Sequence, residues 1–239
     1  MKRFIFLLSF LPLLLASSVW AAVVCGDAIE DANPSPIDPE VVSYTTPAGS
    51  NQVLFVGVVI RSGAANILSA THAGNSMTAI AAEAFLDPIG TRMFYIVSPT
   101  SGTNDVSVDL NGVPLEDAIV VFTCSGVNTV APVHDANTAT GNNTAPTVTV
   151  ANVIAGDVVV DMMGTDIAAS DPTVGANQTA FHTGFILDDI GYGSSQQAGA
   201  DGGVMSWTTA LTQQWAIHAV AVSPAASTGQ PVSLIMLGE

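Results

Sequence analysis

Short apolar runs broken by Gly, Pro, Asn and Ser recur along the chain, and this pattern predicts an all-β protein. The pattern is clearest in Thr91–Gly126, which holds three candidate strands separated by turn residues. Within it, Asp105–Asn111 alternates apolar and polar residues with the period of a strand that has one solvent-facing side. Gln52–Arg61 is a nearly unbroken apolar run, which predicts a strand buried on both faces.

The same pattern continues on both sides of this stretch. Ala79–Leu86 has helix propensity and is predicted to form a short helical segment. Three polar segments, Val127–Pro146, Asp166–Asn177 and Asp188–Gly203, are predicted loops.

Roughly a dozen strands result, which fits an antiparallel β-sandwich of jelly-roll type. No clean internal repeat is evident. The remaining predicted strands are Val41–Thr46, Ile67–Thr71, Ser76–Ala81, Thr147–Val150, Asp157–Met163, Thr179–Leu187, Val204–Leu211 and Gln214–Pro224.

The N-terminus has the three parts of a secretory signal peptide. Lys2 and Arg3 precede the apolar run Phe4–Leu15, and small residues follow it. The apolar run is shorter than a membrane span requires. We therefore expect cleavage after Ala21 or Ala22, a secreted or cell-surface location, and no membrane insertion after the signal is removed.

The remaining chain divides by composition. Residues 22–40 are acidic, contain three Pro, and are predicted to form an extended N-terminal arm, because Pro removes donors and favours extended neighbours. Residues 41–225 are the predicted β-sandwich domain. Residues 226–239 are a short linker and an apolar tail, in which Val232–Leu237 is a candidate strand.

The charge balance narrows the choice of partners. The formal net charge is -16, with 20 Asp and Glu, and removal of the signal leaves Arg61 and Arg92 as the only basic residues apart from His. Nucleic acids and anionic membranes attract clustered positive charge, so both are excluded as partners. The acidic surface can serve solubility outside the cell or cation binding.

Two cysteines, Cys25 and Cys124, lie in the exported part of the chain. An oxidising compartment favours a disulfide between them, which would tie the mature N-terminus to the predicted strand Ala118–Cys124. Free or intermolecular cysteines are the alternative.

Residues Gln52–Ala225 contain a series of short motifs that follow one another in a defined order. A valine-rich strand comes first, then a small polar hairpin before Met77-Thr78 and an aromatic strand running into Pro99-Thr100-Ser101-Gly102. A Val-x-Val strand, Gly-Asp-Val-Val-Val and a Trp-initiated closing strand ending Val222-Ser223-Pro224-Ala225 follow. This order resembles bacterial and phage-associated secreted β-sandwich modules. The resemblance implies a lectin-like jelly-roll fold in a secreted, cell-surface or virion protein, and it transfers no catalytic residues.

Reactive constellations are sparse in the sequence. His72, His134, His182 and His218 stand far apart, whereas a zinc site needs ligands at short spacing. No Gly-x-Ser-x-Gly motif or phosphate-binding loop occurs. We therefore predict a non-catalytic protein. A glycoside hydrolase, with an acid pair such as Glu83 and Glu116, is the remaining enzymatic alternative.

Calcium is the metal that the loops could hold, because Ca²⁺ prefers oxygen ligands. Asp188, Asp189 and Asp201 share one Gly-rich loop and are the candidate ligands, and Asp166 and Asp171 share another loop. Asp and Gly are also ordinary turn formers, which is the simpler explanation.

These observations lead to two functional hypotheses. The first is a secreted structural or interaction module, a subunit of a cell-surface layer, filament or extracellular matrix, whose partners are other copies of itself or surface proteins. The tail Val232–Leu237 could then complete a neighbour's sheet, or it could be the last strand of its own sandwich. The second is a carbohydrate-binding, lectin-like module that binds glycans, with calcium as a candidate cofactor.

Overall fold

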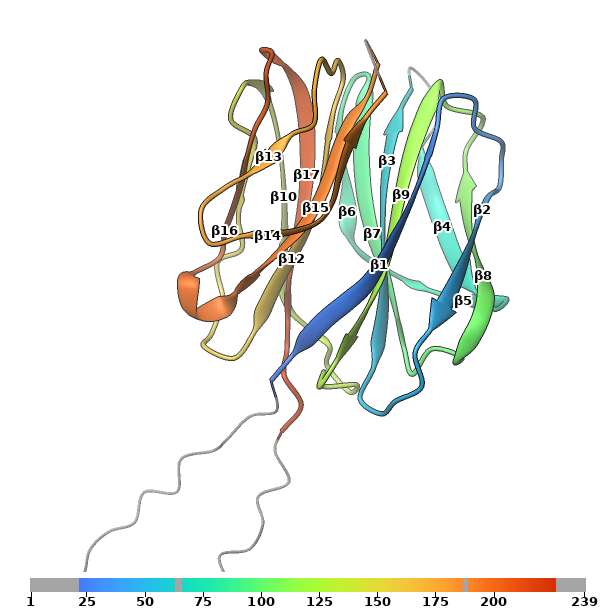
Figure 1. Ribbon diagram of the computed structural model, residues 1–239, viewed down its shortest axis with the longest axis vertical. Helices are drawn as coiled ribbons and strands as arrows, with labels where there is room; N and C mark the ends of the chain where they lie inside the picture. The colour runs from blue at the N-terminus through green and yellow to red at the C-terminus, as the bar shows by residue number, and fades with distance from the viewer. Residues whose placement is uncertain (1–21, 63–65, 187–188, 227–239) are drawn as a thin grey trace, which may run out of the picture.

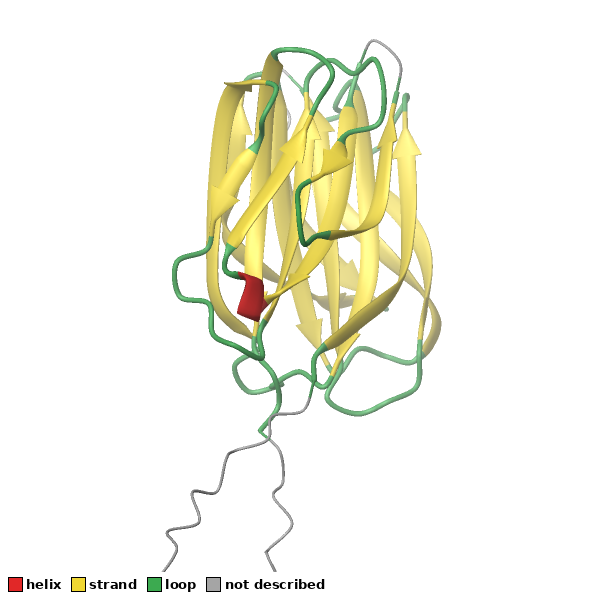
Figure 2. Cartoon of the chain, turned by 60° about the vertical axis from the view of Figure 1, so that its left-hand side comes forward, coloured by secondary structure: helices red, strands yellow, loops and turns green. Residues whose placement is uncertain are grey.

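The structure is a computed structural model that describes residues 22–62, 66–186 and 189–226. These residues form 17 strands in antiparallel sheets and one short 3₁₀ helix, η1 (Gly199–Asp201) (Figure 2). The predicted all-β antiparallel architecture is confirmed at this level. The predicted signal peptide and the apolar tail lie outside the described residues. Within the described part, no helix has the length and apolarity needed to cross a membrane.

The N-terminal half of the chain forms two sheets. The inner N-sheet has the order β1 (Val24–Asn33), β9 (Glu116–Ser125), β3 (Val53–Arg61), β7 (Ile89–Val97), β6 (Thr78–Leu86). The outer N-sheet has the order β2 (Glu40–Thr46), β8 (Gly102–Leu110), β4 (Ile67–His72), β5 (Asn75–Ser76).

The C-terminal half forms two further sheets. The inner C-sheet has the order β10 (Val133–Asn143), β17 (Gln213–Val222), β12 (Val158–Thr165), β15 (Gly191–Ala198), β14 (Thr179–Phe185). The outer C-sheet has the order β11 (Thr147–Thr149), β16 (Val204–Thr208), β13 (Thr173–Val174).

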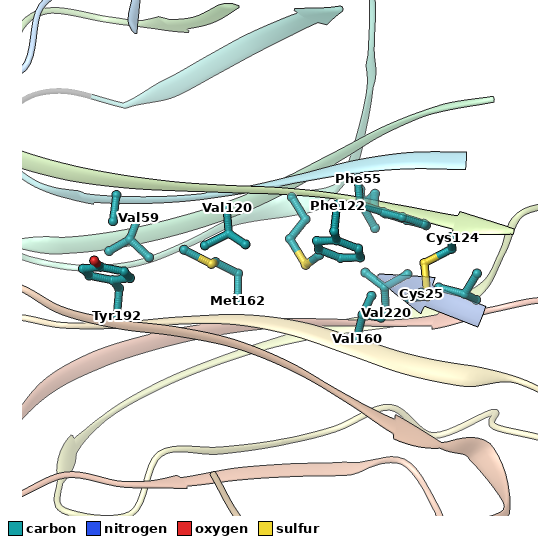
Figure 3. Packing of buried hydrophobic residues seen from close by; sticks show 14 of the residues in the cluster. Cys25, Phe55, Val59, Val120, Phe122, Cys124, Val160, Met162, Tyr192 and Val220 are labelled. Atoms are coloured by element: carbon teal, nitrogen blue, oxygen red, sulfur yellow. A yellow bond between two sulfur atoms is a disulfide. The ribbon is translucent and has the colours of Figure 1, made fainter. Parts of the chain in front are cut away.

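The four sheets lie in four layers, which enclose three apolar interiors (Figure 1). The central interior lies between the two inner sheets and includes Phe55, Phe122, Met162 and Val220 (Figure 3). A second interior separates the inner and outer N-sheets, and a third separates the inner and outer C-sheets. Each inner sheet is therefore covered on both faces, which explains why β3 is a continuous apolar run.

The two halves share one topology, which corrects the expectation that the chain has no repeat. In chain order, β1, β2, β3, β4, β6, β7, β8 and β9 take the same sheet positions as β10 to β17, and β5 is additional. One pair of similar segments in the sequence reflects this shared topology. Phe85–Gly90 reads FLDPIG and Phe185–Gly191 reads FILDDIG. In both halves the Phe pairs with the Gly across adjacent strands.

The inner sheets approach closely where glycines face larger side chains. A Cβ on Gly57 of β3 would lie 3.0 Å from the side chain of Met162 of β12. A Cβ on Gly164 of β12 would overlap the side chain of Val59 of β3. Each half thus contributes one small residue opposite a larger residue of the other half, and the two layers interlock.

The predicted disulfide is confirmed. Cys25 of β1 and Cys124 of β9 face each other in the strand register and are bonded, with a sequence separation of 99 residues (Figure 3). The bond holds the first strand of the chain to the inner N-sheet.

Five local predictions were wrong. The smallest error is the predicted loop Asp166–Asn177, which contains the two-residue strand β13 paired with β16. Most of the predicted arm 22–40 forms β1, and the predicted helical segment Ala79–Leu86 lies in β6, because in both cases pairing with a neighbouring strand outweighs local propensity. The predicted loop Val127–Pro146 contains the polar strand β10. Asp188–Gly203 contains β15, a Gly-, Ser- and Gln-rich strand whose residues are mostly buried.

We expect loss of the disulfide to cost about 4–5 kcal/mol of unfolding free energy, because the bond closes a long loop in the unfolded chain. The test is urea unfolding of a chain carrying Cys25→Ala and Cys124→Ala, compared with the wild-type chain. Reduced wild-type chain should unfold like the variant. A loss below about 1 kcal/mol would show that the loop constraint contributes little.

We expect Gly164→Ala to destabilise the fold by about 1–3 kcal/mol, because the added methyl group overpacks the central interior against Val59. Gly26→Ala is the matched control, since a Cβ at Gly26 meets nothing within 4 Å. Chemical unfolding should place the control within about 0.5 kcal/mol of the wild-type chain. Equal effects of the two substitutions would contradict close packing between the halves.

Candidate functional site

Arg61 joins the two halves through ion pairs. It is the last residue of β3, and the strand ends on the side of the molecule opposite the chain ends (Figure 1). Its Nη1 donates to Glu116 at 3.1 Å and to Asp189 at 3.3 Å, and its Nε donates to Asp166 at 2.8 Å. Glu116 belongs to the N-terminal half, whereas Asp166 and Asp189 belong to the C-terminal half. The pKa of Arg61 is raised, mainly by its hydrogen bond to Asp166. We call these four residues the arginine cluster.

The arginine cluster accounts for two of the residues predicted to bind calcium. Asp189 and Asp166 come from separate predicted loops, but both contact the guanidinium group of Arg61. Asp201 lies in η1 at the other end of β15, so the structure does not bring it together with Asp189. Asp188 lies outside the described residues. Among the residues that are described, no three His, Cys, Asp or Glu side chains are grouped to hold a metal ion.

The four histidines are dispersed in the structure as they are in the sequence. His72 and His218 are fully buried, and burial lowers the pKa of His218 to about 4. His134 Nδ1 lies 2.9 Å from Oδ2 of the buried Asp157, and His182 Nε2 lies 3.2 Å from the backbone oxygen of Ala28. His134 and His182 therefore bind other groups of the same chain, whereas neither ring nitrogen of His218 has a hydrogen-bond partner in the described part of the chain.

The two glutamates considered as an acid pair are far apart. Glu116 lies on β9 and Glu83 on β6, and the sheet order places β3 and β7 between these strands. Three strand spacings correspond to about 14 Å, which exceeds the separation of the carboxylates in glycosidases. Glu116 is also paired with Arg61.

Asp161 organises a buried polar network in the C-terminal half that sequence reasoning missed. Its Oδ1 accepts from the backbone and hydroxyl of Ser195, each at 2.8 Å, and its Oδ2 accepts from Trp207 Nε1 at 2.7 Å. Gln178 extends the network by donating to Ser195 Oγ at 2.8 Å. Burial raises the pKa of Asp161 to about 7, and the hydrogen bonds oppose that rise. The network joins β12, β15 and β16.

Asp117 is the second buried carboxyl that the sequence did not reveal. It is 1% exposed, and neither carboxyl oxygen has a hydrogen-bond partner in the described part of the chain. Burial, followed by the nearby charges of Glu40 and Asp31, raises its pKa to about 8. This shift favours the protonated form of Asp117 at neutral pH.

A surface groove of about 540 Å³ opens between β1 and β2, the edge strands of the inner and outer N-sheets. Asp27 and Ile29 of β1 and Ser43 and Thr45 of β2 line it. Tyr44 also lines it, and the hydroxyl of this buried residue lies 2.8 Å from Thr123 Oγ1. We call it the β1–β2 groove. It is formed by two separate sheet edges, so no local sequence signal could have located it.

The corresponding side of the C-terminal half is closed by side chains. Asn137 of β10 donates to the backbone oxygen of Thr149 of β11 at 2.8 Å. Asp135 accepts from the backbone and side chain of Asn152, at 2.9 and 3.1 Å. In the N-terminal half, the side-chain bond between the equivalent strands runs from Asn33 Nδ2 of β1 to Glu40 Oε1 of β2 at 3.3 Å, at the ends joined by segment 34–39, and neither residue lines the groove.

No family model matches the sequence, and no curated protein or solved structure matches it either. The resemblance to secreted bacterial and phage-associated β-sandwich modules stays a prediction.

Asp117→Asn should flatten the dependence of stability on pH. The pKa of Asp117 is higher in the folded chain than its ordinary value of 3.8, so wild-type stability falls as pH rises from about 4 to about 8. At pH 8 we expect the variant to be more stable by roughly 1–3 kcal/mol, with no gain near pH 4. Urea unfolding across this pH range measures the difference.

Asp161→Asn is the matched control for Asp117→Asn. It places an amide donor among the donor groups of Ser195 and Trp207, so it should destabilise the fold by about 1–3 kcal/mol at neutral pH, where Asp117→Asn does not. An unchanged pH slope in Asp117→Asn would contradict the raised pKa.

Proposed function

We propose that this protein is a secreted, non-catalytic structural module, a subunit that joins other copies of itself in a cell-surface layer, filament or extracellular matrix. The observation that carries the proposal is the β1–β2 groove, which lies between two strand edges that pair with no other described strand. Unpaired edges beside an open interior are the surfaces that accept an added strand.

We also propose that each half is a jelly-roll unit. The orders β1-β9-β3-β7 and β2-β8-β4-β5 in facing sheets support this for the N-terminal half, and the equivalent orders support it for the C-terminal half. The Cys25–Cys124 disulfide supports export, since such bonds persist in oxidising compartments.

Carbohydrate binding is the alternative, favoured by the polar groups of Asp27, Ser43 and Thr45 along the β1–β2 groove. Against it, the two tryptophans in the described residues, Trp207 and Trp215, are 2% and 4% exposed and offer no stacking surface for a sugar ring.

The proposed function predicts self-association of the mature chain 22–239. Light scattering coupled to size-exclusion chromatography should give masses above that of the monomer, which increase with protein concentration. Added calcium should leave them unchanged, because Arg61 occupies the carboxylates of Asp166 and Asp189. A monomer at every concentration would contradict self-assembly and favour glycan binding. A calcium-dependent mass would favour the calcium hypothesis.

A further inference from the structure

The β1–β2 groove lies toward the end of the molecule at which the chain leaves the fold. Ala225 donates to the backbone oxygen of Gly126 at 2.7 Å, and a Cβ on Gly126 would overlap the backbone oxygen of Ala22. Both described chain ends therefore leave the same end of the molecule (Figure 1). Strand β1 starts at this end and β2 runs toward it (Figure 1). The groove is lined by residues 27–29 near the start of β1 and by residues 43–45 and 47 at the end of β2, so it lies toward this end.

Residues 227–239 follow this exit point and contain the apolar segment 232–237, VSLIML. The segment has no charged residue and is about as long as β2 (Glu40–Thr46). The linker 227–231 has five residues, which reach at most about 17 Å when fully extended. The segment can therefore occupy only an acceptor close to the exit point.

The direction of the chain at its exit selects between two acceptors. Strand β17 runs toward this end, and Pro224 and Ala225 continue past Val127 and Gly126. Entry into the chain's own groove would need a reversal, and a β-turn uses four residues of the short linker. A second copy placed against the same end would receive the segment in the direction in which the chain already travels. In that copy, β2 runs the opposite way, so the added strand is antiparallel to it.

We propose that the β1–β2 groove is the acceptor site for residues 232–237 of a second copy, and that two copies facing each other at the ends where their chains exit exchange these segments reciprocally. This inference rests on the proposed function and identifies a contact that pairs two copies. A two-fold pair is closed, so a layer or filament would join such pairs through other surfaces. The segment adds to the outer N-sheet beside β2, with its apolar side chains over Ile29 and Tyr44. A two-fold arrangement uses the same groove and segment on both copies.

The closing experiment mixes two singly substituted chains, one carrying Ser43→Cys in the groove and one carrying Ile235→Cys in the tail. A short bismaleimide cross-linker can join the two added thiols only between different chains. The native cysteines do not compete, because they form a buried disulfide. Thr147→Cys on β11 is the matched control, since it is exposed on the outer C-sheet, where side chains close the corresponding side.

We expect several-fold more covalent dimer from the Ser43→Cys mixture than from the Thr147→Cys mixture. Equal yields would overturn the groove as the acceptor. A chain carrying both Ser43→Cys and Ile235→Cys reports closure on itself. A cross-linked monomer from that chain, with no dimer from the mixture, would overturn exchange between copies.

A chain ending at Ser227 separates this inference from the proposed function. Tail exchange predicts that the full chain associates and that the shortened chain is a monomer by light scattering. Association that persists without the tail would overturn tail exchange and leave self-assembly intact. A full-length monomer would overturn both.

Discussion

The packing of the two inner sheets against each other is the interaction on which the rest of the structure depends. Phe181 of the C-terminal half stacks on Phe122 of the N-terminal half with ring centroids 4.5 Å apart, and Phe122 stacks on Phe55 at 5.5 Å. Because each inner sheet also carries an outer sheet, four layers enclose three interiors. This arrangement agrees with the apolar composition of the strands, since a sheet covered on both faces is built from nearly continuous hydrophobic runs such as β3.

The sequence predicted strands well where one physical effect was dominant. The apolar run at β3 is buried on both faces, as its composition indicated. Strand β15 was missed because its Gly, Ser and Gln residues are buried by different means. The hydroxyl of Ser195 donates a hydrogen bond to Asp161, and the missing side chain of Gly193 leaves room for the ring of Trp207. A buried polar strand depends on partners that lie elsewhere in the chain, and a local pattern does not contain them.

The internal repeat was missed for a related reason. The two halves differ in strand and loop lengths, so equivalent residues do not keep a constant spacing. Ala118-Ile119 of β9 and Ala216-Ile217 of β17 occupy equivalent positions. Ala118 pairs with Val59 of β3, and Ala216 pairs with Gly164 of β12. Val59 and Gly164 in turn contact each other across the central interior. The positions of these dipeptides in the sheets identify them as equivalent. Two identical residues in a β-rich sequence are not enough to indicate a repeat. The sequence could not predict the β1–β2 groove or the arginine cluster for the same reason. Each is formed by residues from separate strands or loops, which only the folded chain brings together.

The two halves differ in how they hold their first strand, and this difference keeps the groove open. In the C-terminal half, Asn137 and Asp135 connect β10 to the segment that follows it, which closes that side. An unbridged edge strand would normally fray, because half of its backbone groups lack partners. In the N-terminal half, the disulfide fixes Cys25 of β1 to β9, and His182 of the other half contacts the backbone of Ala28. These contacts hold β1 from the side of β9 and β14. Its side-chain bond to β2, from Asn33 to Glu40 at 3.3 Å, lies where segment 34–39 joins the two strands and not among the residues that line the groove. An acceptor site for a strand must be ordered yet unfilled, and a covalent anchor away from the groove provides both conditions.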